Sequence, residues 1–94
     1  MNDIIIKLNT AENRSEALDG DKVVGIYDYR KEDNVLDLYH TEVDKSYGGR
    51  GIAADLVDCL VAFARENSYK IHPTCSYVVK KFDKDASYKD VDAR

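Results

Sequence analysis

The sequence has little cysteine and proline and no tryptophan. Its two cysteines, Cys59 and Cys75, are too few for a disulfide scaffold, so we expect reduced thiols in the cytoplasm. No apolar run approaches the roughly 20 residues of a membrane-spanning helix. The first residues also lack the basic and long apolar segments of a secretory signal. The sequence therefore predicts a cytoplasmic protein with no membrane partner.

Positive charge is also in deficit, because 14 Lys and Arg residues stand against 18 Asp and Glu residues, a formal net charge of −4. A non-specific nucleic-acid binder needs an excess of basic residues, so no nucleic-acid partner is expected. A small anionic ligand remains compatible with this charge, since a nest of backbone N–H groups can hold a phosphate. The two histidines and two cysteines lack the close pairing of a structural zinc site, so we expect no metal.

The chain of 94 residues has the size of one small domain. Hydrophobic residues make up 44% and charged residues 34% of it, which is typical of a globular protein. There are no repeats and no low-complexity linkers. We expect residues 1–94 to form a single domain, with residues 83–94 as a polar, frayed tail from which Tyr88 and Val91 could dock.

The first half of the chain has the pattern of β-strands. We expect strands at residues 4–8, 14–18, 23–30 and 35–43, which are rich in β-branched and aromatic residues. Asp19-Gly20-Asp21 is a turn signal between two of these runs. Short connections of this kind predict an antiparallel meander.

The second half begins with the densest group of glycines in the chain, at residues 47–51. Apolar side chains then recur near helical spacing and predict a helix over residues 49–66. A short strand at 69–72 and a second helix at 76–82 follow. The layout predicts an α+β (mixed α/β) domain, in which an antiparallel meander precedes a strand, a glycine loop, a helix, a strand and a helix.

The glycine loop is the segment that says most about function. Glycine permits a sharp turn and a close approach of the backbone to a ligand. The N–H groups of the first helical turn are unpaired, and the helix dipole adds about half a positive charge there. Together these features suit a phosphate or pyrophosphate. The loop lacks the Gly-Lys-Ser/Thr of a P-loop and follows a meander, so the P-loop and dinucleotide patterns both fit poorly.

At this point the sequence resembles the GNAT superfamily of acyl-CoA N-acyltransferases. That family has a Gln/Arg-x-x-Gly-x-Gly/Ala loop between its fourth strand and its long helix. The Gln/Arg position falls on Gly48 here, and Ser76 stands where we would expect proline. The segments that resemble the very small, single-domain branch of the family are His40-Thr41-Glu42-Val43, Gly49-Arg50-Gly51-Ile52-Ala53, Leu56-Val57, Ala64-Arg65-Glu66-Asn67 and Pro73-Thr74-Cys75.

The resemblance implies a GNAT-like fold and a small N-acetyltransferase. Acetyl-CoA would be the co-substrate, and the acceptor would be an amine whose identity the sequence does not give. The backbone amides of the loop would hold the pyrophosphate, and side chains of the second helix would flank the ligand. The residues expected to bind acetyl-CoA are Val43, Gly48, Gly49, Arg50, Gly51, Ile52, Ala53, Tyr77, Lys80 and Lys81.

His40 and Glu42 are candidates for the base that removes the acceptor's proton. They are two residues apart on a strand, so their side chains share a face. Leu36 and Leu38 precede them, and we expect the polar pair to extend this apolar row. The alternative is a histidine that satisfies a buried hydrogen bond and a solvated glutamate at a strand end.

Cys75 lies near the predicted start of the second helix, where the helix dipole favours a thiolate. The resemblance implies either a covalent acyl-cysteine step or a group close to the thioester, although most members of the family use direct attack by the amine. A half-buried packing role beneath the acyl-CoA is the alternative.

A second functional class also fits the sequence. A chain this short leaves little for a substrate cleft, so the protein could be a non-catalytic acetyl-CoA-binding or sensor module. A thiol switch at Cys75 is a third hypothesis. The net negative charge favours a cationic acceptor by steering, and the sequence does not predict an oligomeric state.

Overall fold

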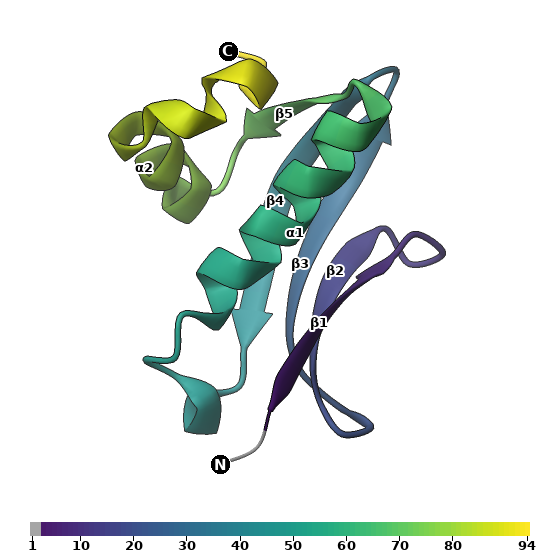
Figure 1. Cartoon of the computed structure of the whole chain (residues 1–94), viewed down its shortest axis with the longest axis vertical. Helices are drawn as coiled ribbons and strands as arrows, with labels where there is room; N and C mark the ends of the chain where they lie inside the picture. The colour runs from purple at the N-terminus through teal and green to yellow at the C-terminus, as the bar shows by residue number, and fades with distance from the viewer. Residues whose placement is uncertain (1–2) are drawn as a thin grey trace.

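The computed structural model describes residues 3–94 as a five-stranded sheet with two α-helices and two 3-10 helices (Figure 1). Strands β1 (Ile4–Asn9), β2 (Arg14–Asp19), β3 (Lys22–Glu32) and β4 (Val35–Val43) form an antiparallel meander. Strand β5 (Lys70–Pro73) pairs in parallel with β4 and completes the order β1-β2-β3-β4-β5. The predicted α+β class and order of elements are confirmed.

The helices lie mainly in the second half of the chain. The 3-10 helix η1 (Lys45–Tyr47) follows β4, and α1 (Ile52–Asn67) connects the glycine loop to β5. Helix α2 (Ser76–Lys84) and the 3-10 helix η2 (Ala86–Val91) complete the chain. None of the helices within residues 3–94 is long and apolar enough to cross a membrane.

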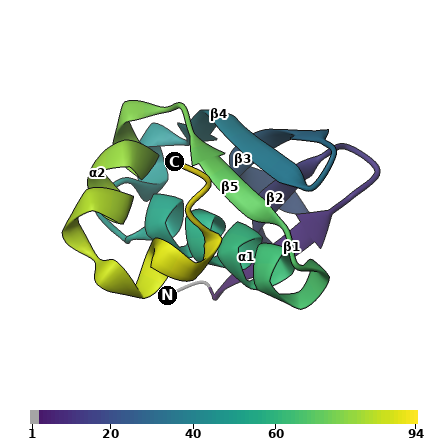
Figure 2. The ribbon, with the colours of Figure 1, turned by 90° about the horizontal axis from the view of Figure 1, so that it is seen from above.

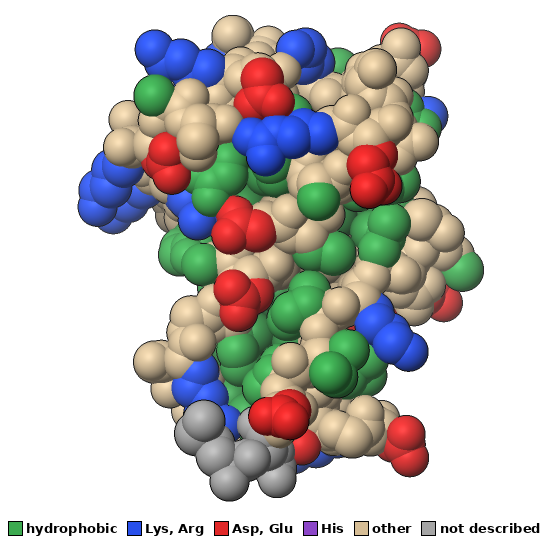
Figure 3. Space-filling model, viewed as in Figure 1, with side chains coloured by type: hydrophobic (Ala, Val, Ile, Leu, Met, Phe, Trp, Pro, Cys, Tyr) green, Lys and Arg blue, Asp and Glu red, His purple; other side chains and the backbone are tan. Residues whose placement is uncertain are grey.

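Helix α1 covers one face of the sheet, which we call the inner face, and no helix of residues 3–94 lies over the opposite, outer face (Figures 1 and 2). The helix buries six side chains against the sheet: Ile52, Leu56, Val57, Leu60, Val61 and Ala64. Acidic side chains are spaced along its exposed side, where Asp55 and Asp58 lie (Figure 3). This amphipathic pattern fixes the helix across the meander.

Gly25 allows the start of α1 to lie close to the sheet. A Cβ atom at this position would lie 3.1 Å from Cγ2 of Ile52 and 3.4 Å from Cδ1 of Leu56. The nearby Ser15 hydroxyl is also buried and donates a hydrogen bond of 3.0 Å to the carbonyl of Leu56. These contacts fix the distance between the first turns of α1 and β3, and so position the loop that precedes α1.

The C-terminal segment at residues 83–94, expected as a polar, frayed tail from which Tyr88 and Val91 could dock, packs against the domain through these two residues. Tyr88 is 7% exposed and Val91 is 2% exposed, so both side chains belong to the core. The Tyr88 ring stacks on Phe82 with centroids 5.0 Å apart. The Ala93 N–H donates a hydrogen bond of 2.8 Å to the carbonyl of Ile71 in β5. The polar side chains that suggested fraying lie on the outside of an ordered turn.

Candidate functional site

A β-bulge in β4 decides where the candidate base residues lie. Strand β3 pairs with Leu38 and next with His40, which leaves Tyr39 without a partner. A bulge of this kind shifts the alternation of side chains by one residue. Leu36 and Leu38 are buried beneath α1, whereas His40 and Glu42 are exposed on the outer face. The prediction that the polar pair extends the leucine row was therefore wrong, and no histidine is visible on the α1 side of the molecule (Figure 3).

His40 and Glu42 share a face, as predicted. The His40 Nε2 atom lies 3.5 Å from a carboxylate oxygen of Glu42, and their side chains are 49% and 72% exposed. Ion pairs this exposed contribute little to stability, about 0–1 kcal/mol. The pair therefore has a small structural value, and both groups remain accessible to a substrate on the outer face.

The loop between η1 and α1 is open and conformationally restricted. Gly49 and Gly51 have φ angles of +77° and +73°, in the left-handed region that favours glycine. A Cβ atom built on either residue would meet nothing within 4 Å. Gly51 is the N-cap of α1 and provides no side-chain capping bond. Glycine is thus favoured here by the backbone angles, and within residues 3–94 nothing lies where a Cβ atom of either glycine would stand.

The same loop carries a run of unpaired backbone donors. The first helical hydrogen bond of α1 runs from the Asp55 N–H to the carbonyl of Gly51, at 3.1 Å. Within residues 3–94, the backbone N–H groups of residues 49–54 find no acceptor. Unpaired N–H groups at the positive end of a helix, here one of 16 residues, are a feature that favours anions. The geometry therefore fits the phosphate-binding role expected of this loop.

Arg50 is the charged side chain within the loop. Its guanidinium lies 5.1 Å from the centroid of the Tyr47 ring, and it is exposed. The Tyr47 hydroxyl donates a hydrogen bond to Asp19, which ties η1 to the end of β2. This hydrogen bond raises the pKa of Tyr47. The aromatic ring thus holds Arg50 beside the unpaired N–H groups, where it can contact the same anion.

Strand β5 leaves part of β4 unpaired. The two strands pair from Val35 to Leu38, and the Cys75 N–H donates a hydrogen bond of 3.3 Å to the Leu38 carbonyl. Beyond Leu38, no strand within residues 3–94 pairs with this edge of β4. The unpaired edge extends to Val43, about 16 Å at the usual rise of a strand. It connects Cys75 at one end to the glycine loop at the other.

Cys75 is the N-cap of α2, close to the predicted position. Its side chain is half-buried and makes no capping hydrogen bond. Tyr27, in β3, has a side chain that is 0% exposed. Burial, and then the Cys75 thiol, raise the pKa of Tyr27. Tyr27 was not among the site residues predicted from the sequence, although the alternation of side chains in β3, which turns Tyr27 and Tyr29 inward, is a signal that could have identified it.

Helix α2 presents a basic surface. Tyr77, Lys80, Lys81 and Lys84 line a cavity of about 270 Å³. Lys81 already has partners on two other elements, because its Nζ atom lies 3.7 Å from Asp58 and 5.0 Å from the centroid of the Tyr88 ring. Burial lowers the pKa of Lys81, but Tyr88 and Asp58 outweigh it and the net shift is upward. Lys80 and Lys84 are exposed and available to an anion.

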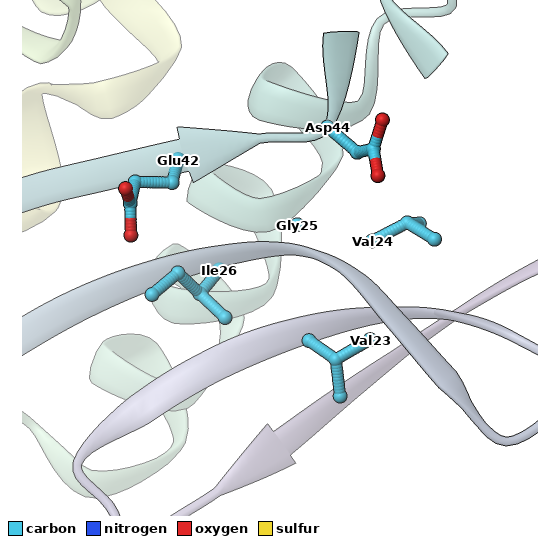
Figure 4. A pocket seen from close by; sticks show the side chains of 6 residues that line it. All are labelled: Val23, Val24, Gly25, Ile26, Glu42 and Asp44. Atoms are coloured by element: carbon cyan, nitrogen blue, oxygen red, sulfur yellow. The ribbon is translucent and has the colours of Figure 1, made fainter. Parts of the chain in front are cut away.

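The outer face carries cavities of the opposite charge. One of about 240 Å³ has an apolar floor from β3 and two carboxylates, Glu42 of β4 and Asp44 just after it (Figure 4). A second, of about 400 Å³, is lined by Arg30, Glu32, Asp33, Val35, Asp37 and His72. Carboxylates attract a protonated amine rather than a phosphate. No group of three or more His, Cys, Asp or Glu side chains within residues 3–94 is arranged to hold a metal ion.

A mixed sheet whose fourth strand leads through an open glycine loop into a helix, and whose fifth strand pairs with only part of the fourth, defines a GNAT-like domain. The sequence pattern that describes the GCN5-related N-acetyltransferases matches residues 14–91. The chain therefore belongs to the GCN5-related N-acetyltransferase family, and the resemblance seen in the sequence is confirmed.

Relatives and solved structures agree with this assignment. The chain is similar to the protein NATD1 of Gallus gallus and of Homo sapiens, with 42% identity over 60 residues in each, or 64% of this chain. These residues cover 54% and 52% of the two relatives, so the chain spans about half their length. The solution structure of a GCN5-like protein from Staphylococcus aureus matches 97% of this chain and 89% of its own, with a TM-score of 0.75 and 32% identity.

Proposed function

We propose that this protein is a small N-acetyltransferase that transfers an acetyl group from acetyl-CoA to an amine. The observation that carries the proposal is the run of unpaired N–H groups at residues 49–54, which lies open at the start of α1. Family membership adds the expectation that the anion held there belongs to acetyl-CoA. The two free cysteines fit a reducing compartment such as the cytoplasm.

The residues that would hold acetyl-CoA follow from the geometry of the loop. The backbone of Gly48 to Ala53 would bind the pyrophosphate, and the Arg50 guanidinium would add a charge. The unpaired edge of β4, which ends at Val43, offers backbone partners to an extended amide-containing chain. On α2, Tyr77, Lys80 and Lys81 would flank the nucleotide, with Lys80 as the exposed cation. Acetyl-CoA itself supplies the acetyl group, activated as a thioester.

Side chains along this edge and at its Cys75 end have the chemistry that the reaction needs. His40, whose Nε2 atom lies 3.5 Å from Glu42, would accept the proton of the acceptor amine. Glu42 could take this proton itself through water, so the assignment of the base rests on His40→Ala and Glu42→Gln. Cys75 would either accept the acetyl group or lie beside the thioester. Orientation and stabilisation of the oxyanion would supply most of the rate enhancement.

Titration with acetyl-CoA, followed by backbone amide chemical shifts, tests the binding step. We expect the largest shifts at residues 49–53, with smaller ones along β4 from Tyr39 to Val43. Dephospho-CoA is a matched probe, and its weaker binding would identify the lysines of α2 as partners of the 3′-phosphate. If the loop shifts stay unchanged at millimolar acetyl-CoA, the proposed function is wrong.

The exposure of His40 and Glu42 on an uncovered face favours a second candidate, a non-catalytic acetyl-CoA-binding or sensor module. A screen of acetyl-CoA consumption with polyamines, amino acids, aminoglycosides and lysine peptides separates the two. Turnover that His40→Ala or Cys75→Ala reduces, with acetyl-CoA binding retained, supports the enzyme. Binding without turnover of any amine in the panel supports the sensor.

A further inference from the structure

Tyr27 carries a buried polar atom that has no partner. Its side chain is 0% exposed. Among the buried side-chain oxygen and nitrogen atoms of residues 3–94, the Tyr27 hydroxyl is the one without a hydrogen-bond partner. Buried polar groups are nearly always satisfied, so an exception at a candidate site calls for a functional explanation.

The strand register shows where this hydroxyl lies. Tyr27 pairs with Thr41, just beyond the bulge at Tyr39, and its side chain is turned to the inner face. On the other edge of β4, the Cys75 backbone is hydrogen-bonded to Leu38. Tyr27 and Cys75 therefore flank the same short stretch of β4. After burial, the Cys75 thiol is the largest cause of the raised pKa of Tyr27.

The hydroxyl can act only as a donor toward this thiol. Burial raises the pKa of Tyr27, so the phenol keeps its proton under ordinary conditions. A neutral thiol is a weak hydrogen-bond acceptor, which agrees with the lack of a formed bond in the structure. A thiolate is a much stronger acceptor, because hydrogen bonds to charged groups are shorter and stronger than those between neutral groups.

We propose that Tyr27 is a positioning residue for Cys75: its hydroxyl donates a hydrogen bond to the sulfur once the thiol has lost its proton to water, and so makes Cys75 the reactive thiol of this protein. The lone pair on sulfur accepts the phenolic hydrogen, and no covalent bond of Tyr27 is broken. The proposed function gives this reactive thiol its use, but the reactivity itself does not require acetyl-CoA.

The second cysteine, Cys59, serves as an internal reference for the reactivity of Cys75. Cys59 is half-buried, as Cys75 is, but it lies in the middle of α1. Burial raises the pKa of Cys59, and no polar neighbour opposes this shift. If Tyr27 activates Cys75, the two thiols should differ in reactivity although both are half-buried.

The test is alkylation of the full chain, free of ligand, by iodoacetamide at neutral pH, with each cysteine followed by peptide mass spectrometry. In the wild type we expect Cys75 to react at least several-fold faster than Cys59. In Tyr27→Phe the rate at Cys75 should fall by roughly 3- to 10-fold. Without the hydrogen bond from Tyr27 a smaller fraction of Cys75 is thiolate, and the higher nucleophilicity of that thiolate offsets only part of the loss.

Tyr29→Phe is the matched control, because Tyr29 lies on the same strand and face, is 3% exposed, and its pKa is raised by burial and then by Tyr69 rather than by Cys75. It should leave the rate at Cys75 unchanged. The rate at Cys59 should stay constant in both variants, which shows that the fold has not opened. Since Tyr27→Phe removes an unpaired hydroxyl, its Tm should be unchanged or raised.

Two results would overturn the inference. One is a wild-type Cys75 that reacts no faster than Cys59. The other is a Tyr27→Phe variant whose Cys75 rate matches that of Tyr29→Phe. Acetyl-CoA titration of the same proteins distinguishes the two proposals. If the wild type does not bind acetyl-CoA, the proposed function is wrong. The role of Tyr27 still holds in that case if Cys75 reacts faster than Cys59 and Tyr27→Phe slows it.

Discussion

Replacing Gly51 by alanine tests whether the backbone of the glycine loop determines ligand binding. Gly51 has a φ of +73°, and a Cβ atom there would meet nothing within 4 Å, so backbone strain is the sole direct cost. An L-residue held in the left-handed region costs about 1–2 kcal/mol. For a domain of this size that corresponds to a fall in Tm of about 4–16 °C. Relief of the strain would rotate the N–H groups at the start of α1 away from a common point.

Gly20→Ala is the matched variant, because Gly20 has a φ of +61° and equally open surroundings but lies in the β2–β3 turn. We expect both variants to lose similar stability in thermal unfolding followed by circular dichroism. By calorimetry, Gly51→Ala should bind acetyl-CoA at least about 10-fold more weakly, since a lost hydrogen bond to a charged group has this effect or more. Gly20→Ala should bind as the wild type does. Equal affinities in the two variants would refute the role of the loop backbone.

Three further predictions concern packing and the C-terminal segment. Gly25→Ala should destabilise the fold by about 1–3 kcal/mol through overpacking against Ile52, and Ile52→Ala should relieve part of this cost in a denaturant double-mutant cycle. Val91→Ala should lower the free energy of unfolding by about 1–3 kcal/mol in the same measurement. A change near zero would instead support a frayed C-terminal segment. The pKa of Asp92 is lowered, chiefly by its hydrogen bond with Arg94. The charged carboxylate therefore stabilises the fold at pH values above the pKa of Asp92 in the unfolded chain, and this stabilisation is lost as the pH falls through the pKa of Asp92 in the folded protein. The amide protection factor of Ala93 should therefore fall below about pH 4, and a constant value there would contradict the coupling.

The elements of the fold were predictable because each has a local signal. Alternating and β-branched residues marked the strands, and the spacing of Leu56 and Leu60 marked α1. The glycine loop was predictable for the same reason, since its angles require glycine at positions 49 and 51. The tail was predictable only in part: Tyr88 and Val91 could be identified as candidates for docking, but their contacts with α1 and β5 could not, because those partners are distant in sequence. Such contacts have no periodic pattern that a single sequence could reveal.

The bulge at Tyr39 is the feature that most limited the prediction of the site. Nothing in the order of residues from Leu36 to Glu42 distinguishes a regular strand from a bulged one, because the extra residue is specified by pairing with β3. Its consequence is that His40 and Glu42 lie on the outer face, whereas Tyr27, which we propose to position Cys75, is buried on the inner face. If both sets of groups act in one acyl transfer, the reacting carbon must lie between the faces, in the plane of the sheet. The free edge of β4 beyond Leu38 is open to both faces. In a regular strand without the bulge, His40 and Glu42 would lie on the inner face, on the same side as Tyr27. The base, the thiol and the incoming amine would then all have to approach the acyl group from one side.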